Sequence, residues 1–318
     1  MGSQLPLFDD YKDTEKLKEM LKQSLEPIPI FKDNNNSLDE LIPEEALLAL
    51  NRNYPTSAIH VSRIIKLSAD KISKGVNITR EEISSELAIP WARTQGTINV
   101  MRKMELLKPN SSLTPFGQLV YQFSPFIDDH GLLWLLHYLV SSNANLVIWS
   151  YLFNQIIETK EEFTINDITP GFVSLEGRWS SKSLRTKAPK EIGGIVHSYT
   201  DDIFSPLKLI DKVDTGVYYA NRNSGIIPPL IWLSILLIYR ARYYPGVSAL
   251  EIPLIIDANF SPGRICYRSE LLVRQTLDDL HNANLLTVET RSGLDQIRFK
   301  KEINWLSAVQ MYFEETLS

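Results

Sequence analysis

The sequence has a single cysteine, Cys266, so it lacks the thiols for an intrachain disulfide, a cysteine-rich zinc module or a Cys-Cys redox pair. This favours a cytoplasmic protein, because disulfides accumulate in oxidising compartments. A GxxxxGK[ST] loop, a GxGxxG turn after a strand and an HExxH helix are also missing, which excludes ordinary nucleotide hydrolases and zincin proteases. The longest apolar run, residues 226–239, is too short to cross a bilayer and predicts a buried helix, so no membrane association is expected.

The charge of the chain is unevenly distributed. Its formal net charge of −5 over 318 residues argues, as an average, against a nucleic-acid-binding protein. Residues 1–50, however, hold eleven acidic residues and five lysines, whereas residues 51–318 hold 28 basic and 27 acidic residues. The body is therefore almost neutral, and its basic patches permit nucleic-acid binding. We expect the acidic tail to dock a partner or to screen a basic surface.

The pattern of apolar and polar residues divides the chain into four regions. We predict a mainly α fold with small β-hairpins (α+β), in which two winged helix-turn-helix units surround a helical middle region. The regions are an acidic N-terminal tail and linker (1–52), a winged-helix domain (53–124), a helical middle region with a basic loop (125–225) and a C-terminal winged-helix domain (226–318).

The first winged unit is predicted from capping signals and apolar stripes. In order, its elements are a striped helix over 57–72 closed by Gly75, a helix opened by the capping box Thr79 to Glu82, a third helix over 91–105, a small hairpin over 106–113 and a helix opened by Thr114-Pro115.

The same order of elements returns near the C-terminus. The predicted elements are a helix over 230–244, a second capping box over 248–251, a segment started by Ser261-Pro262, a helix over 268–284 with the stripe Val273, Leu277 and Leu280, and a β-hairpin over 285–300. The middle region contributes two largely buried helices, within 132–139 and 146–157.

The third helix of the first unit has one polar face. On a 3.6-residue period Trp91, Ile98 and Met101 point toward the core. The other face, which surrounds Gly96, carries the candidate DNA-reading residues Gln95, Asn99, Arg102 and Lys103. Amide side chains pair with adenine edges and arginine with guanine, so this face suits the major groove. A solvated helix face that touches nothing is the alternative.

Two further basic clusters are candidate phosphate contacts. Five cations without an intervening acid, Arg178, Lys182, Arg185, Lys187 and Lys190, surround several serines and Trp179, whose indole suits stacking on an unpaired base. A mobile solvated loop is the alternative for this run. In the C-terminal hairpin Arg291 and Arg298 suit phosphate, whereas Glu270, Asp278 and Asp279 make the preceding helix a better protein interface.

Carboxylates provide the only candidate catalytic groups. Asp201 and Asp202 lie after the basic run, where they are suited to hold Mg²⁺ or Mn²⁺ for a nuclease reaction, although adjacent aspartates are also common in turns. His130 and His137, behind Asp128-Asp129, suggest a metal site, but the simpler interpretation is an Asp129 cap and a hydrogen-bonded core histidine.

Several apolar motifs resemble a known family. They are the segment from Leu113 to Leu119, the segment from Asp128 to Tyr138, the segment from Trp149 to Asn154, Ser183-Leu184 and Tyr199. Together they resemble a domain-of-unknown-function family that is commonly encoded beside phosphoadenosine-phosphosulfate-reductase-like proteins in bacterial DNA phosphorothioation clusters. The resemblance covers roughly residues 55–300, and it carries over no catalytic residue.

The resemblance implies a DNA-binding component of a phosphorothioation defence system. Its family includes the nicking component of the single-stranded phosphorothioation system, which works with a cysteine desulfurase, an ATPase and an ATP-pyrophosphatase-like sulfur-transfer protein. Nicking of the DNA backbone for sulfur insertion is then one expectation, and a homodimer is left open. The other is a non-catalytic winged-helix adaptor or transcription regulator that binds DNA or a partner ATPase.

Overall fold

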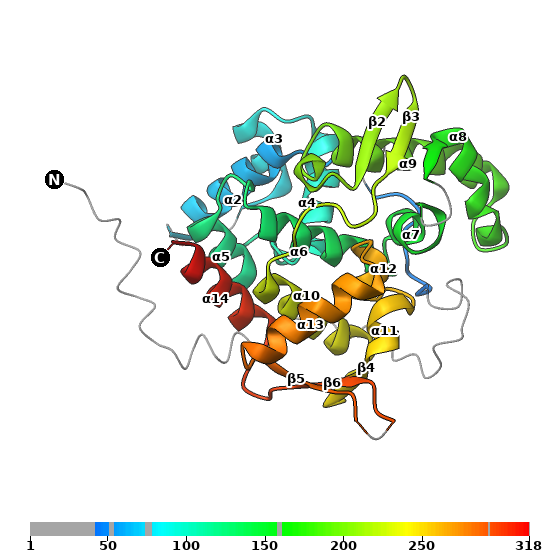
Figure 1. Cartoon of the computed structure of the whole chain (residues 1–318). Coiled ribbons are helices and arrows are strands. Elements are labelled where there is room, and N and C mark those ends of the chain that lie inside the picture. Colours follow the sequence, from blue (N-terminus) through cyan, green and yellow to red (C-terminus); the bar gives the residue numbers. More distant parts are fainter. Residues whose placement is uncertain (1–41, 51–53, 74–77, 158–160, 292, 318) are drawn as a thin grey trace.

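A computed structural model describes residues 42–50, 54–73, 78–157, 161–291 and 293–317. Within them the chain is mainly helical, with two small three-stranded antiparallel sheets. In Figure 1 these sheets lie at the top and bottom of the view with the helical body between them. The expected tail up to residue 41, and Gly75, lie outside the described residues.

Two of the four helices in the first unit begin at the predicted caps. Thr79 accepts a hydrogen bond from the N–H of Glu82, whose carboxylate accepts one from the N–H of Thr79. Thr114 likewise accepts from the N–H of Gly117. The helices are α2 (Ala58–Ser73), α3 (Arg80–Leu87), α4 (Trp91–Lys103) and α5 (Pro115–Phe123).

Two details of this unit differ from expectation. The segment over 106–113 forms one isolated bridge, between Leu107 and Leu113, instead of a hairpin with named strands. Trp91 is 43% exposed and does not join the core, because it lies in the first turn of α4, whereas Ile98 and Met101 are fully buried.

The centre of the molecule is built from helices that are apolar on nearly every side. They are α6 (His130–Ser141), α7 (Val147–Tyr151) with the π-helical turn η2 (Leu152–Ile156), and α10 (Pro229–Tyr243). Beside them lies α14 (Trp305–Leu317), which is buried on one side and exposed in its last turn. Helix α10 packs against both α6 and α14. This confirms the two buried helices predicted for the middle region. Among the described residues, no helix is both long and apolar enough to span a membrane.

A chain of hydrogen bonds through His137 ties these helices to the middle region. His137 donates through Nε2 to the carbonyl of Ile265 (3.0 Å), so its Nδ1 accepts from the hydroxyl of Tyr199 (2.6 Å). Trp149 donates to the same hydroxyl oxygen (3.2 Å). Burial lowers the pKa of His137 to about 4, so the imidazole is neutral. His137 is thus a core residue, with both ring nitrogens occupied.

The middle region contains a sheet that the sequence did not indicate. Its strands pair antiparallel in the order β1-β3-β2, with Phe163 opposite Tyr218 and Asp211 opposite Tyr219. The basic run, expected as a loop, instead enters a twenty-residue helix. The elements are β1 (Glu162–Thr164), α8 (Ile165–Ile168), η4 (Thr169–Leu175), α9 (Ser181–Thr200), η5 (Ser205–Leu207), β2 (Ile210–Asp214) and β3 (Val217–Ala220).

The C-terminal region forms the second sheet, in the order β4-β6-β5. The predicted hairpin and the buried stripe of Val273, Leu277 and Leu280 are confirmed. The predicted capping box over 248–251 is wrong, because residues 249–251 pair with β6 and Glu251 makes no side-chain cap. The elements are β4 (Ala249–Glu251), α11 (Ile252–Asp257), α12 (Pro262–Ile265), α13 (Glu270–Asn282), β5 (Leu286–Glu289) and β6 (Gln296–Phe299).

Candidate nucleic-acid interface

The first half of α9 presents a cationic face. Ser180 caps this helix by accepting a hydrogen bond from the N–H of Ser183 (3.2 Å), and Leu184 and Ala188 are buried on its inner side. The exposed side chains are Lys182, Arg185, Lys187 and Lys190. None of these four has an ion pair or side-chain hydrogen bond within the described part of the chain. We call Lys182, Arg185, Lys187 and Lys190 the α9 cationic face.

Arg178 and Trp179, which precede α9, are already engaged. Arg178 donates through Nη1 to the carbonyl of Ile42 (2.7 Å), and its guanidinium carbon lies 5.0 Å from the centre of the Trp179 ring. Trp179 is half-buried and packs against the core. A base that stacks on this indole must therefore share the ring with Arg178.

The segment 42–50, expected as part of the tail, packs along the inner side of α9. Its residues Ile42, Ala46 and Leu48 are buried. The N–H of Leu47 donates to the carbonyl of Asn145 (3.1 Å), and the N–H of Leu50 donates to Oε1 of Glu191 in α9 (2.9 Å). These contacts hold residues 42–50 against the helical body, and the segment begins at residue 42, beside Arg178.

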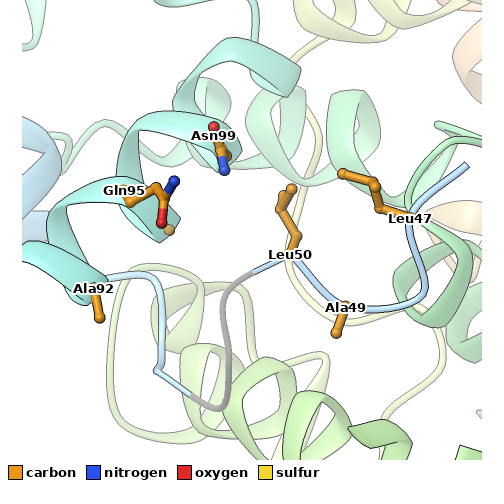
Figure 2. A pocket seen from close by; sticks show the side chains of 7 residues that line it. Leu47, Ala49, Leu50, Ala92, Gln95 and Asn99 are labelled. Carbon is orange, nitrogen blue, oxygen red and sulfur yellow. The ribbon is translucent and has the colours of Figure 1, made fainter. Parts of the chain in front are cut away.

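The same segment covers part of the polar face of α4 (Figure 2). Gln95 and Asn99 line a pocket of about 160 Å³ with Gly96 and Ala92 on one side and Leu47, Ala49 and Leu50 on the other. The two amides that the sequence predicts to read bases thus lie opposite a segment of the same chain.

Arg102 and Lys103 lie at the end of α4. Arg102 donates through Nη2 to the carbonyl of Pro109, and its Nε is buried without a described partner. Burial, and then the charge of Arg80, lower the pKa of Arg102. Lys103 is partly exposed. Of the four predicted reading residues, two line the pocket and Arg102 turns toward the following loop.

Asp201 and Asp202 follow the last turn of α9. Asp202 accepts through Oδ1 from the N–H of Ala58 (2.9 Å), and thereby satisfies the first turn of α2. Asp201 accepts from the hydroxyl of Thr200 (2.5 Å) and lies 3.6 Å from Nε2 of His197. Over the described ranges, no group of three or more His, Cys, Asp or Glu side chains is arranged to hold a metal ion.

A set of charged residues that sequence reasoning missed lies around His60. Burial, and then the charges of Arg93 and Arg63, lower the pKa of His60, while Asp202 acts in the opposite direction. Nδ1 of His60 and Nε of Arg93 are both buried without a hydrogen-bond partner in the described structure. No local pattern indicates this grouping, because it joins α2, α4 and the end of α9.

In the second sheet, Arg298 has an intramolecular partner. It donates through Nε and Nη2 to the carboxylate of Glu289 on the neighbouring strand (2.9 and 3.1 Å). Arg274 of α13 is held similarly, by Asp295 through two bonds (2.9 and 2.8 Å) and by Glu270 (2.7 Å). Arg291 is exposed in the β5–β6 connection.

The residues before α6 confirm the structural alternative to a metal site. Asp129 accepts from the N–H of Leu132 (2.7 Å) and from the hydroxyl of Tyr312 (2.9 Å), so it caps the helix. His130 accepts through Nε2 from the indole of Trp134 (3.1 Å). Asp128 lies in the loop before α6 and accepts from the hydroxyl of Ser124 (3.3 Å).

Comparison with known proteins gives a family and a fold. A sequence model of the family described as "Protein of unknown function (DUF4007)" matches residues 90–313, more than half of the chain. The magnesium ion-bound crystal structure of SspB aligns at a TM-score of 0.67 and 14% identity, over 89% of this chain and 92% of that one. A second SspB crystal structure gives the same score and identity over 88% and 91%. No curated protein matches the sequence.

Proposed function

Since the chain belongs to the DUF4007 family and has the fold of SspB, we propose that it is the DNA-binding component of a bacterial DNA phosphorothioation system. The family resemblance supports the system, and one structural observation supports DNA as the ligand. This observation is the α9 cationic face, whose four charges have no partner within the described chain. Exposed cations without intramolecular partners suit the negative charge of a phosphate backbone.

We place the two winged helix-turn-helix units in this proposal as the elements that orient α9. The sheet order β4-β6-β5, with α11, α12 and α13 inserted between β4 and β5, supports a winged unit at the C-terminus. The order α2, α3, α4 and the bridge at Leu107 support a reduced one near the N-terminus. In the first unit Gln95 and Asn99 contact bases only if the segment 47–50 gives way.

The proposed contacts extend along one helix. Lys182 and Lys190 are exposed on α9, and Asp201 follows Thr200, where the helix ends. At 1.5 Å per residue, Lys182 and Asp201 are separated by roughly 28 Å along the axis, and Lys190 and Asp201 by about 16 Å. Phosphates of one duplex can therefore contact the α9 cationic face while a phosphate further along the same duplex reaches the acidic end of the helix.

The proposal also includes nicking of the DNA backbone, with Asp201 and Asp202 as the carboxylates that bind the metal ion. Mg²⁺ commonly binds one or two carboxylates and completes its shell with waters and substrate phosphates, so these two residues fit a partly hydrated Mg²⁺ or Mn²⁺. When bound, such an ion neutralises charge at the attacked phosphate. SspB has been crystallised with a magnesium ion, which supports testing this ion first.

The neighbours of Asp202 have roles in the same proposal. Burial, and then the charges of Arg93 and Arg63, lower the pKa of His60 and favour its neutral form, so its buried Nδ1 must become exposed before it can exchange a proton with a substrate. Arg93 lacks a hydrogen-bond partner for its Nε, but this atom is buried and the guanidinium carbon lies 5.8 Å from the centre of the Tyr54 ring, so a phosphate reaches it only after a local rearrangement. Trp179, Arg178 and Arg298 remain predicted contacts that already have intramolecular partners, and Arg291 remains a predicted contact that is exposed.

A DNA-retention and nicking assay on the full chain tests the proposal. Purified protein is expected to retain a labelled duplex at 50 mM salt and to convert supercoiled plasmid to the nicked circle with Mg²⁺ or Mn²⁺. Loss of nicking with intact DNA binding in the double variant Asp201→Asn, Asp202→Asn supports the enzyme, with Asp278→Asn, Asp279→Asn as the matched control. Absence of both activities in the unaltered protein contradicts the proposal.

A non-catalytic adaptor is the second candidate function. It is favoured by the bond from the N–H of Ala58 to Asp202, which gives that carboxylate a structural role, and by the acidic exposed surface of α13. Its expected partners are the cysteine desulfurase, the ATPase and the ATP-pyrophosphatase-like protein of the system, or a second copy in a homodimer. Retention of duplex without nicking under any divalent ion, together with capture of the ATPase, identifies this function.

A further inference from the structure

The chain enters its described structure beside the α9 cationic face. The carbonyl of Ile42 accepts from Nη1 of Arg178 (2.7 Å), two residues before the Ser180 cap of α9. The segment 42–50 then runs to the middle of the helix, where the N–H of Leu50 donates to Glu191 (2.9 Å). Residue 42, where the described structure begins, therefore lies at the end of α9 that carries the cations.

The residues that precede this point are acidic. Residues 1–41 hold nine acidic residues and five lysines, a net charge of −4, and residues 181–190 hold four cations and no acid. Forty-one residues reach up to about 135 Å when extended, at roughly 3.3 Å each, whereas ten helical residues extend over only about 15 Å. The segment is thus long enough and of the right sign to cover the face.

We propose that the N-terminal segment 1–41 binds the α9 cationic face when DNA is absent, so that duplex and the chain's own acidic segment compete for one surface. The competition rests on the proposed function, but the binding of the segment does not. Because the segment is covalently joined to Ile42, its carboxylates have a high effective concentration near the α9 cationic face. A free acidic partner has no such advantage, which is why the occupant is a segment of the same chain.

Zero-length carbodiimide cross-linking of the full chain tests the docking without DNA. The reagent joins carboxylates to lysine amines in direct contact, and peptide mass spectrometry identifies the pairs. We expect cross-links from acidic residues of 1–41 to Lys182, Lys187 and Lys190 at 50 mM salt, and their loss at 0.5 M salt, where screening acts over about 4 Å. Lys66 and Lys301, which are also exposed, serve as internal controls.

Mixing isotopically light and heavy chains identifies the occupant. Cross-links within one isotope support the proposal. Cross-links between a light and a heavy chain assign the face to the acidic segment of a second copy and overturn the proposal. Cross-links that reach Lys66 and Lys301 as often as the α9 lysines also overturn it. Absence of links to all three α9 lysines also overturns it.

A matched pair of variants tests the competition with DNA. The triple variant Asp33→Asn, Asp39→Asn, Glu40→Gln and the control Asp278→Asn, Asp279→Asn, Glu302→Gln each remove three negative charges. Exposed opposite-charge pairs change a binding constant by about 1.4-fold to fivefold each, so the first variant is expected to bind duplex about threefold to tenfold more tightly at 50 mM salt. The control is expected to change affinity less than twofold, and equal changes in both overturn the competition.

The two experiments separate the two proposals. Cross-links to α9 in a protein that retains no DNA support the docking and contradict the proposed function. Tight DNA binding without cross-links, and with unchanged affinity in the first variant, supports the function and overturns the docking.

Discussion

The cations of α9 and the cations of the C-terminal sheet differ in what they contact. On α9, Lys182, Arg185, Lys187 and Lys190 are exposed and unpaired within the described structure. In the C-terminal region, Arg298 is bound by Glu289, and Arg274 by Asp295 and Glu270. Residues 181–190 carry four cations and no acid, whereas residues 270–299 carry three arginines and five acids.

This difference separates a candidate DNA surface from a candidate protein surface. An unpaired cation releases a counterion when it meets a phosphate, so each contact adds affinity. A paired arginine must first give up a carboxylate, which then repels the same phosphate. We infer that α9 contacts DNA and that the C-terminal surface suits a protein partner, and four predictions test this contrast in order of expected size.

Removal of the α9 charges has the largest expected effect. In the variant Lys182→Gln, Arg185→Gln, Lys187→Gln, Lys190→Gln, the loss of four phosphate contacts is expected to weaken duplex binding about a thousandfold at 0.1 M salt. Fluorescence anisotropy with a labelled duplex measures the change. A control that removes four other exposed charges, Lys66→Gln, Lys108→Gln, Lys212→Gln, Lys301→Gln, is expected to stay within tenfold. Equal losses in both variants contradict a specific role for α9.

Acidification is expected to destabilise the core that joins the two regions. The pKa of His137 is about 4 in the folded protein and near 6.5 when unfolded, so below pH 6.5 only the unfolded state takes up this proton. Its contribution to stability is complete above pH 6.5 and falls as the pH drops toward 4, by up to roughly 3 kcal/mol. Denaturant unfolding between pH 7 and 4 measures it. If the unfolding free energy changes with pH by the same slope in the variant His137→Asn, the assignment of this effect to His137 is wrong.

Loss of the Tyr199 hydroxyl tests how firmly α9 is held. Tyr199→Phe removes the donor to His137 and the acceptor for Trp149, and is expected to cost about 1–3 kcal/mol of unfolding free energy. Tyr219→Phe, on an exposed strand, is expected to cost less than about 0.5 kcal/mol. Equal costs would show that the network does not anchor the helix.

Release of the paired arginines has the smallest expected effect. The variant Glu289→Gln, Asp295→Asn frees Arg298 and weakens the hold on Arg274, and is expected to raise duplex affinity about threefold at 50 mM salt if DNA passes near this sheet. The control Asp278→Asn, Asp279→Asn removes the same charge without releasing an arginine. Unchanged affinity in both variants places the C-terminal surface away from DNA and sharpens the contrast with α9.

Local signals predicted the helices well and the second sheet in part. Thr79 with Glu82, Thr114 before Pro115, and the stripe of Val273, Leu277 and Leu280 each act within one turn or one face, so they are readable from the sequence. The first sheet is not readable, because its three-residue strand β1 pairs with β3 more than fifty residues later.

For the candidate site, the sequence predicted which residues take part better than how they are arranged. The cations of α9 were identified, but their helix was not, because Gly and Pro residues around them favour a loop. Residues 42–50 were assigned to the acidic tail and linker, yet Ile42 and Leu48 are buried by contacts with distant elements. The grouping of His60, Arg93 and Asp202 depends on the packing of three helices, and nothing local indicates it.

Lysine acetylation of the full chain, with and without duplex, tests the central claim most directly. A limiting dose of an acetylating reagent followed by peptide mass spectrometry gives the reactivity of each lysine. Saturating duplex at low salt is expected to protect Lys182, Lys187 and Lys190, while Lys66, Lys212 and Lys301 react as before. Protection of the second set, with α9 lysines unchanged in bound protein, would contradict the assignment of α9 as the DNA contact.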